Sequence, residues 1–525
     1  MPGDEFIFLY GPPGVGKSVV GRQLAEDMAL PFYDLDAEVA ARSGAAIPEI
    51  FALEGEAGFR QREGRALVAL LEATGGVIAL GGGTLLNGDL RKRVEAAGAV
   101  LCLHAPPETL LERLAATGDE RPLLSGDVKA RLQDLVAARA DHYRSFPSQL
   151  DAAIDSPREV SWQARVCLGR FHVRGMGPRG YDVIILREGL DQLGSALTRL
   201  GLRGPVALVS DENVAPRYAA RLEASLGQAD LACQLLTIPA GEAHKTMATV
   251  EELWEGFIRA GLARQSTVVA LGGGVVGDLA GFAAGTYLRG VAWVAVPTSL
   301  LAMVDASLGG KTGTNLPQGK NLVGVFHPPR LVLADPEALA SLPETELRAG
   351  LAEVLKAGVI GDPALFALCS QGWEAVLASL EEIVRRAAAV KVKVIQEDPF
   401  EEGPRMALNF GHTVGHALEA ASGFRLRHGE AVAIGMVVET RLAERLGLAE
   451  SGLTEEIVTV LRGLGLPTRV PVDLDQAAIY RAMQRDKKRT PERLRFSLPT
   501  RVGEVCIRIV ENEWKRIEHA LRDGS

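Results

Sequence analysis

The chain has 525 residues and a formal net charge of −9, with 47% hydrophobic and 23% charged residues. This length and composition provide enough apolar material for about three packed domains, which excludes an intrinsically disordered protein. The acidic balance excludes a protein that binds nucleic acid through a broadly basic surface, so we expect small anionic molecules to be bound in local basic pockets.

The apolar run FIFLY near the N-terminus is followed by GPPGVGKS. Glycines at Gly11, Gly14 and Gly16 before Lys17 and Ser18 are typical of a strand, a phosphate-wrapping turn and the start of a helix. In such a turn backbone N–H groups surround phosphates, Lys17 adds positive charge, and Ser18 offers a hydroxyl to Mg²⁺. The sequence therefore predicts a nucleotide-binding kinase or hydrolase in this part of the chain.

Two carboxylates end the segment PFYDLD. Asp34 and Asp36 alternate, so on a strand both side chains would leave the same face. One would reach a metal ion and the other a substrate hydroxyl; two solvated turn carboxylates are the alternative. The continued alternation of strands and helices predicts a parallel sheet in a first domain, residues 1–170, and the glycine-rich stretch 171–180 predicts a linker.

A second α/β alternation follows in YDVIIL, PVALVSD, CQLLTIPAG, STVVALGGG and VAWVAVPTS. From Pro336 onward long amphipathic stretches replace the strands, such as Ala364–Leu380 and Glu381–Val394. We therefore expect an α/β nucleotide-binding lobe at residues 181–335 and a mostly helical lobe at residues 336–525.

The strand STVVALGGG runs into VVGD, and glycines at such a turn allow a pyrophosphate to approach the backbone. Asp211 and Asn213 follow an earlier strand and could bind a ribose, and Glu242 and Lys245 in GEAHKT support the same site. An α/β fold with ordinary turns is the alternative.

A carboxylate and two histidines in the helical lobe predict a metal centre. Glu353 lies in GLAEVLKAG, where Lys356 shares its helical face. NFGHTVGH places His412 and His416 one turn apart, and RHGEAV supplies His428. Two imidazoles and one carboxylate leave an open position for substrate, as a catalytic Zn²⁺ requires; buried structural histidines are the alternative.

Further charged and amide side chains recur in glycine-rich loops and on nearby helices, where they could form local basic pockets; solvated surface side chains without a function are the alternative. They are Asp305, Lys311, Lys320, Asn321, Lys391, Arg405 and Asn409.

FYDLD, IFALEGEAGFRQRE, IALGGG, ERPLL and ARADHY stand in the order and spacing of shikimate kinase, which residues 5–168 resemble. The resemblance implies ATP and Mg²⁺ as cofactors, with Asp34 near the metal and Asp36 accepting the proton of the attacking hydroxyl. It also implies two arginines on the shikimate carboxylate, a glycine backbone against the ring and a lid arginine over the transferred phosphoryl group. These residues are Arg60, Arg139, Gly81, Gly82, Gly83 and Arg121.

GGGVVGD, YLRG, DASLGGKTGTN, GLAEVLKAG, NFGHTVGH, RHGEA and RDKK closely resemble 3-dehydroquinate synthase over residues 175–525. The resemblance implies Zn²⁺ or Co²⁺ on Glu353, His412 and His428. It implies NAD⁺ bound by Asp211, Asn213, Glu242, Lys245, Gly273, Gly274, Asp278, Thr298, Ser299 and Lys320. It implies substrate contacts and catalytic roles for Arg289, Asp305, Lys311, Asn321, Lys356, Lys391, Arg405, Asn409, His416 and Lys488.

Together the resemblances imply a bifunctional enzyme of aromatic amino-acid biosynthesis. One half would phosphorylate shikimate with MgATP. The other would convert 3-deoxy-D-arabino-heptulosonate 7-phosphate to 3-dehydroquinate and phosphate, returning its NAD⁺ unchanged, in a homodimer formed through this half. The alternatives are a metal-dependent polyol dehydrogenase or a related sugar-phosphate cyclase in the second half, or a non-catalytic nucleotide-sensing or scaffolding module in either.

Location is predicted from two absences in the sequence. It contains neither an apolar stretch long enough to span a bilayer nor the pattern of a signal peptide, so we expect a cytoplasmic protein without a membrane partner. The five cysteines form no C-x-x-C pair, and we expect them to be reduced and buried.

Overall fold

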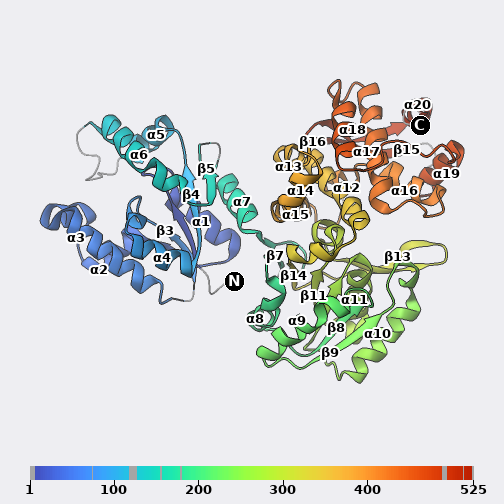
Figure 1. Ribbon diagram of the computed structural model, residues 1–525, viewed down its shortest axis with the longest axis horizontal. Helices are drawn as coiled ribbons and strands as arrows, with labels where there is room; N and C mark the ends of the chain where they lie inside the picture. The colour runs from blue at the N-terminus through green and yellow to red at the C-terminus, as the bar shows by residue number, and fades with distance from the viewer. Residues whose placement is uncertain are drawn as a thin grey trace. The chain divides into compact units, whose positions relative to one another are not determined.

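The computed structural model describes residues 6–73, 75–117, 127–153, 156–177, 180–401, 403–486, 493–511 and 514–522 (Figure 1). Contacts divide the chain into two compact units, Met1–Leu168 and Gly169–Ser525, each with its own sheet. Among the helices in these ranges, none combines the length and the apolar character that crossing a bilayer requires.

The first unit is built on a five-stranded sheet with the strand order β2-β3-β1-β4-β5, in which every neighbouring pair is parallel. This confirms the parallel α/β sheet expected from the alternating strands and helices. The elements are β1 (Phe6–Tyr10), α1 (Lys17–Met28), β2 (Phe32–Asp34), α2 (Leu35–Ser43), α3 (Ile47–Leu70), β3 (Gly76–Ala79), α4 (Gly88–Ala97), β4 (Gly98–His104), α5 (Pro107–Thr117), α6 (Val128–Arg144), β5 (Ser148–Asp151) and α7 (Pro157–Leu168).

Strand β1 is apolar throughout because both faces of the sheet are covered by helices. Phe6, Phe8 and Tyr10 pack with side chains of α2, α3 and α4, whereas Ile7 and Leu9 pack with side chains of α1, α5 and α7. These two cores hold the carboxyl end of β1 in the middle of the sheet. The loop that follows it, the expected phosphate-binding turn, therefore starts from a rigid position.

The second unit contains a seven-stranded sheet with the order β6-β7-β14-β11-β10-β8-β9, and a separate hairpin of β12 and β13. All neighbours in the large sheet are parallel except β6, which is antiparallel to β7. Its elements are β6 (Arg170–Val173), β7 (Tyr181–Ile185), α8 (Leu193–Arg199), β8 (Arg203–Asp211), α9 (Ala215–Gln228), β9 (Cys233–Ile238), α10 (Met247–Arg259), β10 (Ser266–Gly272), α11 (Gly274–Thr286), β11 (Ala292–Pro297), β12 (Lys311–Leu316), β13 (Gly319–Phe326) and β14 (Leu331–Ala334).

Helices dominate after β14, as expected, but one more hairpin, β15 with β16, follows them. The elements are α12 (Glu344–Gly361), α13 (Pro363–Cys369), α14 (Trp373–Ala378), α15 (Leu380–Glu397), α16 (His412–Ala421), α17 (His428–Arg445), α18 (Leu453–Gly463), α19 (Gln476–Asp486), β15 (Arg493–Arg501), β16 (Glu504–Glu511) and α20 (Trp514–Arg522). The stretch expected as one helix at Ala364–Leu380 is divided into α13 and α14, because Gly372 turns the chain with φ of 90°.

Two expected boundaries differ from the structure. The first three residues of the expected linker, 171–173, belong to β6, which extends the large sheet by pairing with β7. The two expected lobes, 181–335 and 336–525, form one compact unit, because α15 of the helical part packs against β6, β7 and the turn Ala302–Ala306 of the α/β part.

The cysteines are all free, but only Cys102 and Cys369 are buried. The expectation of burial is wrong for Cys167, Cys233 and Cys506, which are partly accessible because they lie near the ends or edges of their elements.

Candidate active sites

The loop between β1 and α1 is arranged to receive an anion. Lys17 Nζ donates hydrogen bonds to the carbonyl oxygens of Gly11 (2.9 Å) and Pro12 (3.0 Å), which holds its charge over the loop. No side chain caps the start of α1 after Gly16, so the first N–H groups of the helix remain open to phosphate. Gly11 has φ of 135°, and a Cβ there would lie 2.3 Å from the carbonyl oxygen of Leu103.

The two expected magnesium ligands meet beside this loop. Ser18 Oγ donates to Asp34 Oδ2 at 2.6 Å, which joins the start of α1 to the end of β2. A hydroxyl and a carboxylate at this spacing are oxygen ligands of the type Mg²⁺ prefers, so the pair fits this metal.

Asp36 does not lie on a strand, so the expectation that it leaves the same strand face as Asp34 is wrong. Asp34 Oδ1 accepts the N–H groups of Asp36 (3.1 Å) and Ala37 (3.4 Å), and this cap ends β2 and starts α2. The exposed Asp36 therefore stands in the first turn of a helix, directly beside the Ser18–Asp34 pair.

Two arginines from different helices converge on the glycine run after β3. A Cβ on Gly83 would lie 2.6 Å from Arg60 Nη2 and 3.2 Å from Arg139 Nη1. Arg139 Nη1 also donates to the carbonyl oxygen of Gly82 at 3.0 Å. The expected carboxylate-binding residues are thus close together, with glycine backbone between them.

Buried polar residues that sequence reasoning missed support this arrangement. Glu63, 1% exposed, accepts from Arg60 Nη1 (2.8 Å) and from Thr84 Oγ1 (2.7 Å). The hydroxyl of Tyr143 donates to the carbonyl oxygen of Gly82 at 2.7 Å. The spacing of Arg60 and Glu63 at i and i+3 was a usable signal, whereas the contact of Tyr143 with a glycine 61 residues away was not.

The expected lid residue Arg121 lies outside the described residues, as does Lys488 in the second unit.

In the second unit, Glu353, His412 and His428 come together from α12, α16 and α17, as the sequence predicts. Glu353 Oε1 lies 3.5 Å from His412 Nε2 and 3.4 Å from His428 Nε2. Glu353 is 2% exposed, and both its carboxylate oxygens lack a hydrogen bond of normal geometry, although Lys356 on the same helix forms an ion pair with it.

The three side chains fit a tetrahedral metal ion. Metal–ligand bonds of about 2.1 Å place tetrahedral ligands about 3.4 Å apart, close to the separations found here. His412 Nδ1 is 3.2 Å from the carbonyl oxygen of Phe410, which can only accept. The Nδ1 atom therefore carries the proton and Nε2 turns its lone pair toward Glu353.

Electrostatics suit a metal centre at His412 and Glu353. At His428 burial lowers the pKa, but the carboxylates of Glu353 and Glu419 outweigh it and raise the pKa to about 10, so this imidazole gives up a proton when a metal binds. Burial and the nearby Lys356 lower the pKa of His412 to about 3, which leaves its imidazole neutral, as a metal ligand must be. Burial would raise the pKa of Glu353, but Lys356 and the two histidines lower it well below the ordinary value.

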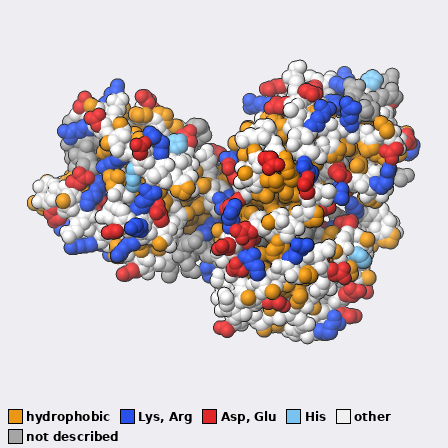
Figure 2. All heavy atoms as spheres, viewed as in Figure 1, with side chains coloured by type: hydrophobic (Ala, Val, Ile, Leu, Met, Phe, Trp, Pro, Cys, Tyr) orange, Lys and Arg blue, Asp and Glu red, His pale blue; other side chains and the backbone are white. Residues whose placement is uncertain are grey.

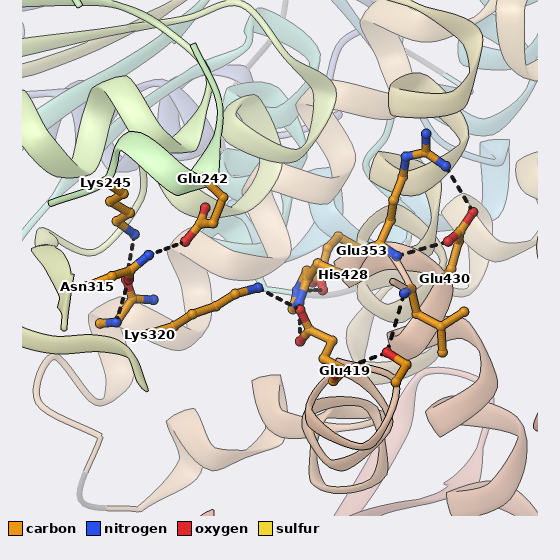
Figure 3. A network of polar contacts seen from close by, with 12 residues as sticks. Glu242, Lys245, Asn315, Lys320, Glu353, Glu419, His428 and Glu430 are labelled. Carbon is orange, nitrogen blue, oxygen red and sulfur yellow. Dashed lines mark hydrogen bonds and ion pairs between the residues drawn. The ribbon is translucent and has the colours of Figure 1, made fainter. Parts of the chain in front are cut away.

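Glu419 is a carboxylate next to the centre that sequence reasoning did not single out. Its Oε2 lies 3.3 Å from His428 Nδ1, and its Oε1 accepts from Lys320 Nζ at 3.1 Å. Figure 3 shows Lys320 extending from the hairpin toward Glu419, with His428 on the other side of the carboxylate. The His416 ring lies 5.2 Å from the His412 ring, so His416 also borders this region.

A pair of partly exposed, opposite charges adjoins the metal-binding residues. Lys391 Nζ on α15 donates to Asp305 Oδ1 (2.6 Å) and to the carbonyl oxygen of the same residue (2.8 Å). Burial would raise the pKa of Asp305, but Lys391 lowers it below the ordinary value; the charges of Glu353 and Lys356 also act on this carboxyl.

Lys311, at the start of β12, contacts the loop before α16. It forms an ion pair with Glu401, whose other oxygen accepts from Asn409 Nδ2 at 3.2 Å. Arg405 in the same loop is 2% exposed and packs on Gly309, where a Cβ would lie 2.5 Å from its Nη2 atom. These residues connect the hairpin with the metal-binding helices.

Lys245 is the centre of a further cluster at the start of α11. It is 3% exposed, forms an ion pair with Asp278 and donates to Asn321 Oδ1. Burial raises the pKa of Asp278 above its ordinary value, although Lys245 opposes the shift. Nearby, Glu242 Oε1 accepts from Asn315 Nδ2 at 2.7 Å, as Figure 3 also shows.

The expected pyrophosphate site lies at the N-terminus of α11. Gly273 precedes the helix, Gly274 begins it, and no side chain caps its first N–H groups, which fits a bound phosphate. A Cβ on Gly273 would lie 3.4 Å from Ser299 Oγ, and the N–H of Thr298 donates to the carbonyl oxygen of Gly272 at 3.0 Å. Both expected residues after β11 are thus next to the glycine turn.

Three other expected residues are less closely connected to these clusters. Asp211 Oδ1 accepts the backbone N–H of Asn213 at 2.8 Å, and Asn213 is exposed at the end of β8. Arg289 is exposed with φ of 68° and forms no hydrogen bond or ion pair with the other described candidates.

Charged side chains of both signs are mixed over the visible face of each unit in Figure 2. On that face the positive side chains form no continuous stripe.

Comparisons with known families match both units. Residues 13–166 match the family model of shikimate kinase, and residues 235–349 and 350–489 match the N-terminal and C-terminal models of 3-dehydroquinate synthase. The 3-dehydroquinate synthase of a Synechococcus species is 47% identical over 338 residues, which cover 62% of this chain and 91% of that protein. The enzyme of Xanthomonas campestris is 47% identical over 341 residues, covering 63% and 92%.

Related solved structures cover the second unit. A 2-deoxy-scyllo-inosose synthase complexed with carbaglucose-6-phosphate, NAD⁺ and Co²⁺ is similar with a TM-score of 0.62 and 28% identity, covering 68% of this chain and 100% of that chain. The 2-epi-5-epi-valiolone synthase of Streptomyces hygroscopicus, with NAD⁺ and Zn²⁺ bound, has a TM-score of 0.59 and 31% identity, covering 67% and 99%.

Proposed function

The chain belongs to the 3-dehydroquinate synthase family and carries a shikimate kinase domain before it, and from this premise we propose which residues perform each reaction. It is a bifunctional enzyme that phosphorylates shikimate and forms 3-dehydroquinate. The observation that carries the residue roles is that each unit brings together polar side chains from distant parts of the chain, Ser18 with Asp34 in the first unit and Glu353 with His412 and His428 in the second.

In the kinase unit we assign the phosphates of ATP to Gly11, Gly14, Gly16 and Lys17, and Mg²⁺ to Ser18 and Asp34. Mg²⁺ neutralises the developing phosphate charge when bound. Arg60 and Arg139 bind the shikimate carboxylate beside the glycines Gly81–Gly83, because guanidinium forks match a planar carboxylate. Arg121, outside the described residues, keeps its proposed role over the transferred group.

The exposed Asp36 is the proposed proton acceptor. The hydroxyl oxygen of shikimate attacks the γ-phosphorus of ATP, the bond from phosphorus to the bridging oxygen breaks, and ADP leaves. The hydroxyl proton passes to an Asp36 carboxylate oxygen. The cap that Asp34 forms with the Asp36 N–H holds this carboxylate next to the metal position, which supports the assignment.

In the synthase unit we assign Zn²⁺ or Co²⁺ to Glu353, His412 and His428. When bound, the metal polarises the reacting hydroxyl and NAD⁺ takes up and returns a hydride. The cofactor is assigned to the glycine turn before α11 and the residues around it, which are Asp211, Asn213, Glu242, Lys245, Gly273, Gly274, Asp278, Thr298, Ser299 and Lys320.

The remaining residues of this unit bind and orient the phosphorylated substrate. Lys356 forms an ion pair with the metal ligand Glu353, which supports its assignment to the reacting hydroxyl. We assign further side chains of this unit to the phosphate and the carboxylate of the substrate, whose charges positive and amide groups would offset. They are Arg289, Asn321, Lys311, Lys391, Arg405, Asn409, His416 and Lys488, with Asp305 orienting Lys391.

A test of the redox cycle uses substoichiometric NAD⁺ and the heptulosonate phosphate substrate. We expect many phosphate molecules released per NAD⁺ without net NADH, because the same nicotinamide takes up and returns the hydride. Absorbance of reduced nicotinamide is followed beside phosphate release. NADH accumulating in proportion to product would instead support a polyol dehydrogenase.

A homodimer through the synthase unit is also proposed. Leu322 and Phe326 on β13 and the neighbouring Phe400 are each at least 50% exposed, and the two phenylalanine rings are 6.0 Å apart. A second copy could cover this apolar surface. Light scattering of the purified protein tests the dimer.

The five free cysteines are consistent with a reducing compartment, which supports the proposed cytoplasmic location.

A further inference from the structure

One carboxylate joins the metal centre to the hairpin of the α/β part. Glu419 is 5% exposed on α16 and uses each oxygen for a different partner. Oε2 lies 3.3 Å from His428 Nδ1, and Oε1 lies 3.1 Å from Lys320 Nζ. In Figure 3 Glu419 stands between these two side chains, which come from α17 and β13.

The contact with His428 fixes the state of that imidazole. An ionised carboxylate can only accept, so His428 Nδ1 carries a proton, and Nε2 faces Glu353, 3.4 Å away, where it would give its lone pair to a metal ion bound between them. Carboxylates behind metal-binding histidines orient the ring and raise its basicity in this way.

The contact with Lys320 fixes a side chain that would otherwise be mobile. Lys320 lies on the exposed hairpin strand β13, and 35% of its side chain is accessible. Besides Glu419, its ammonium group is 4.5 Å from the centre of the Phe424 ring. Asn321, the next residue, contacts Lys245 in the proposed cofactor site. Lys320 and Asn321, which are neighbours on β13, thus contact Glu419 beside the metal-binding residues and Lys245 in the proposed cofactor site.

We propose that Glu419 is a positioning residue for the synthase reaction, which orients the metal ligand His428 and the cofactor-site lysine Lys320 at the same time. This inference rests on the proposed function of the synthase unit. Its physical basis is that a carboxylate offers two separate acceptor oxygens to two donors. A glutamine offers one acceptor and one donor, so it can serve only one of them.

The first experiment measures Co²⁺ binding to the metal-free full-length protein by visible absorbance. We expect Glu419→Gln to weaken Co²⁺ affinity about 10- to 100-fold, the usual effect of losing such a partner. It should also raise KM for NAD⁺, because Lys320, which is assigned to the cofactor, loses its anchor. Glu430→Gln is the matched control: Glu430 is two residues from His428 but binds Arg427, so Co²⁺ affinity should stay within about threefold.

A double-mutant cycle separates positioning from general damage. Lys320→Gln alone should raise KM for NAD⁺ and leave Co²⁺ affinity within about threefold of wild type. Combined with Glu419→Gln, it should restore Co²⁺ affinity at least about threefold relative to Glu419→Gln alone. The reason is that the glutamine introduced on α16 can then give its amide oxygen to His428 and its amide N–H to the glutamine that replaces Lys320. If Glu419→Gln weakened Co²⁺ binding only by damaging the fold, the added Lys320→Gln substitution would not restore the affinity.

Two results would overturn the proposal: Co²⁺ affinity of Glu419→Gln equal to that of Glu430→Gln, or a double variant no better than the single one. If Glu419→Gln does not fold, Glu419→Asp replaces it. This variant keeps the negative charge but has a side chain one methylene shorter, so its carboxylate lies farther from His428 and Lys320. Unchanged Co²⁺ affinity of Glu419→Asp would equally count against the proposal. Wild-type protein that binds Co²⁺ but does not release phosphate would instead contradict the proposed function.

Discussion

Arg139 and Arg60 are placed so that one planar anion can be held between them, and this pairing leads to a prediction about substrate binding. Lysine at position 139 keeps the charge but loses the guanidinium fork. We expect Arg139→Lys to raise KM for shikimate about tenfold or more, the cost of a lost charged hydrogen bond, while KM for ATP changes little. Initial rates measured at varied shikimate and varied ATP check this.

Arg144→Lys is the matched control for that variant. Arg144 lies on the same helix, but 73% of its side chain is exposed and its partner is Asp141, so both KM values should stay near wild type. If Arg139→Lys raises the KM for shikimate and the KM for ATP by the same factor, the assignment of Arg139 to the shikimate carboxylate is wrong.

The residues proposed to bind phosphate or metal were easier to predict than the residues that fix the positions of such side chains. Lys17 and the Glu353–His412–His428 set follow recognisable local patterns, and the structure brings the second set together. Glu63 and Glu419 were not singled out. The i, i+3 spacing of Arg60 and Glu63 was a local signal that was overlooked, whereas other partners of these two buried carboxylates lie far away in the sequence. Thr84 and Lys320, their partners, are 21 and 99 residues distant.

Helices α16 and α17 carry His412 and His428 at their first residues, and glycines allow the two helices to approach closely. A Cβ on Gly435 would lie 2.0 Å from the carbonyl oxygen of Gly411, immediately before His412. The N-terminus of α16 is fixed further by the buried Glu439, which accepts the N–H of Gly411 at 2.8 Å. The distance between the two imidazoles thus depends on helix packing.

Gly435→Ala should therefore disturb both stability and metal binding. Overpacking at this crossing should lower the free energy of unfolding by about 1–3 kcal/mol, and it should weaken Co²⁺ affinity because α16 moves relative to α17. Gly463→Ala in α18 is the control, since a Cβ there meets nothing within 4 Å, and it should be neutral or slightly stabilising. Urea unfolding and Co²⁺ titration of both variants are the measurements; equal behaviour would argue against a packing role for Gly435.

Element types were predicted better than element ends. Strand β1 and helix α1 follow from an apolar run and a glycine turn. The end of β2 could not be predicted from the sequence. Whether Asp34 continues a strand or caps a helix depends on its hydrogen bonds to Asp36 and Ala37. The division at Gly372 was likewise missed, since the amphipathic pattern continues across a glycine whose φ of 90° only the backbone reveals.

The chain as a whole consists of two units, each with its own sheet and its own candidate site. The family resemblances predicted this arrangement, whereas length alone suggested three domains. The α/β and helical parts of the second unit share one set of contacts because α15 packs on the large sheet's β6 and β7. The metal centre and the proposed cofactor site therefore belong to the same compact body.

Separate units should function independently. Lys17→Ala removes the charge of the phosphate loop, and we expect kinase activity to fall on the order of 100-fold or more, because the stabilisation of the transferred phosphoryl group is lost. Synthase activity of the same preparation should remain within about twofold. If Lys17→Ala folds but loses both activities, this result would contradict two independent active sites.

The most direct measurement assays one purified preparation for both reactions before and after metal removal. A chelator should abolish phosphate release from the heptulosonate substrate, and Zn²⁺ or Co²⁺ should restore it, because Glu353, His412 and His428 form a site only the synthase reaction uses. Shikimate phosphorylation should return with Mg²⁺ alone. Synthase activity that survives chelation, or kinase activity that requires Zn²⁺ or Co²⁺ to return, would contradict two chemically separate sites in this chain.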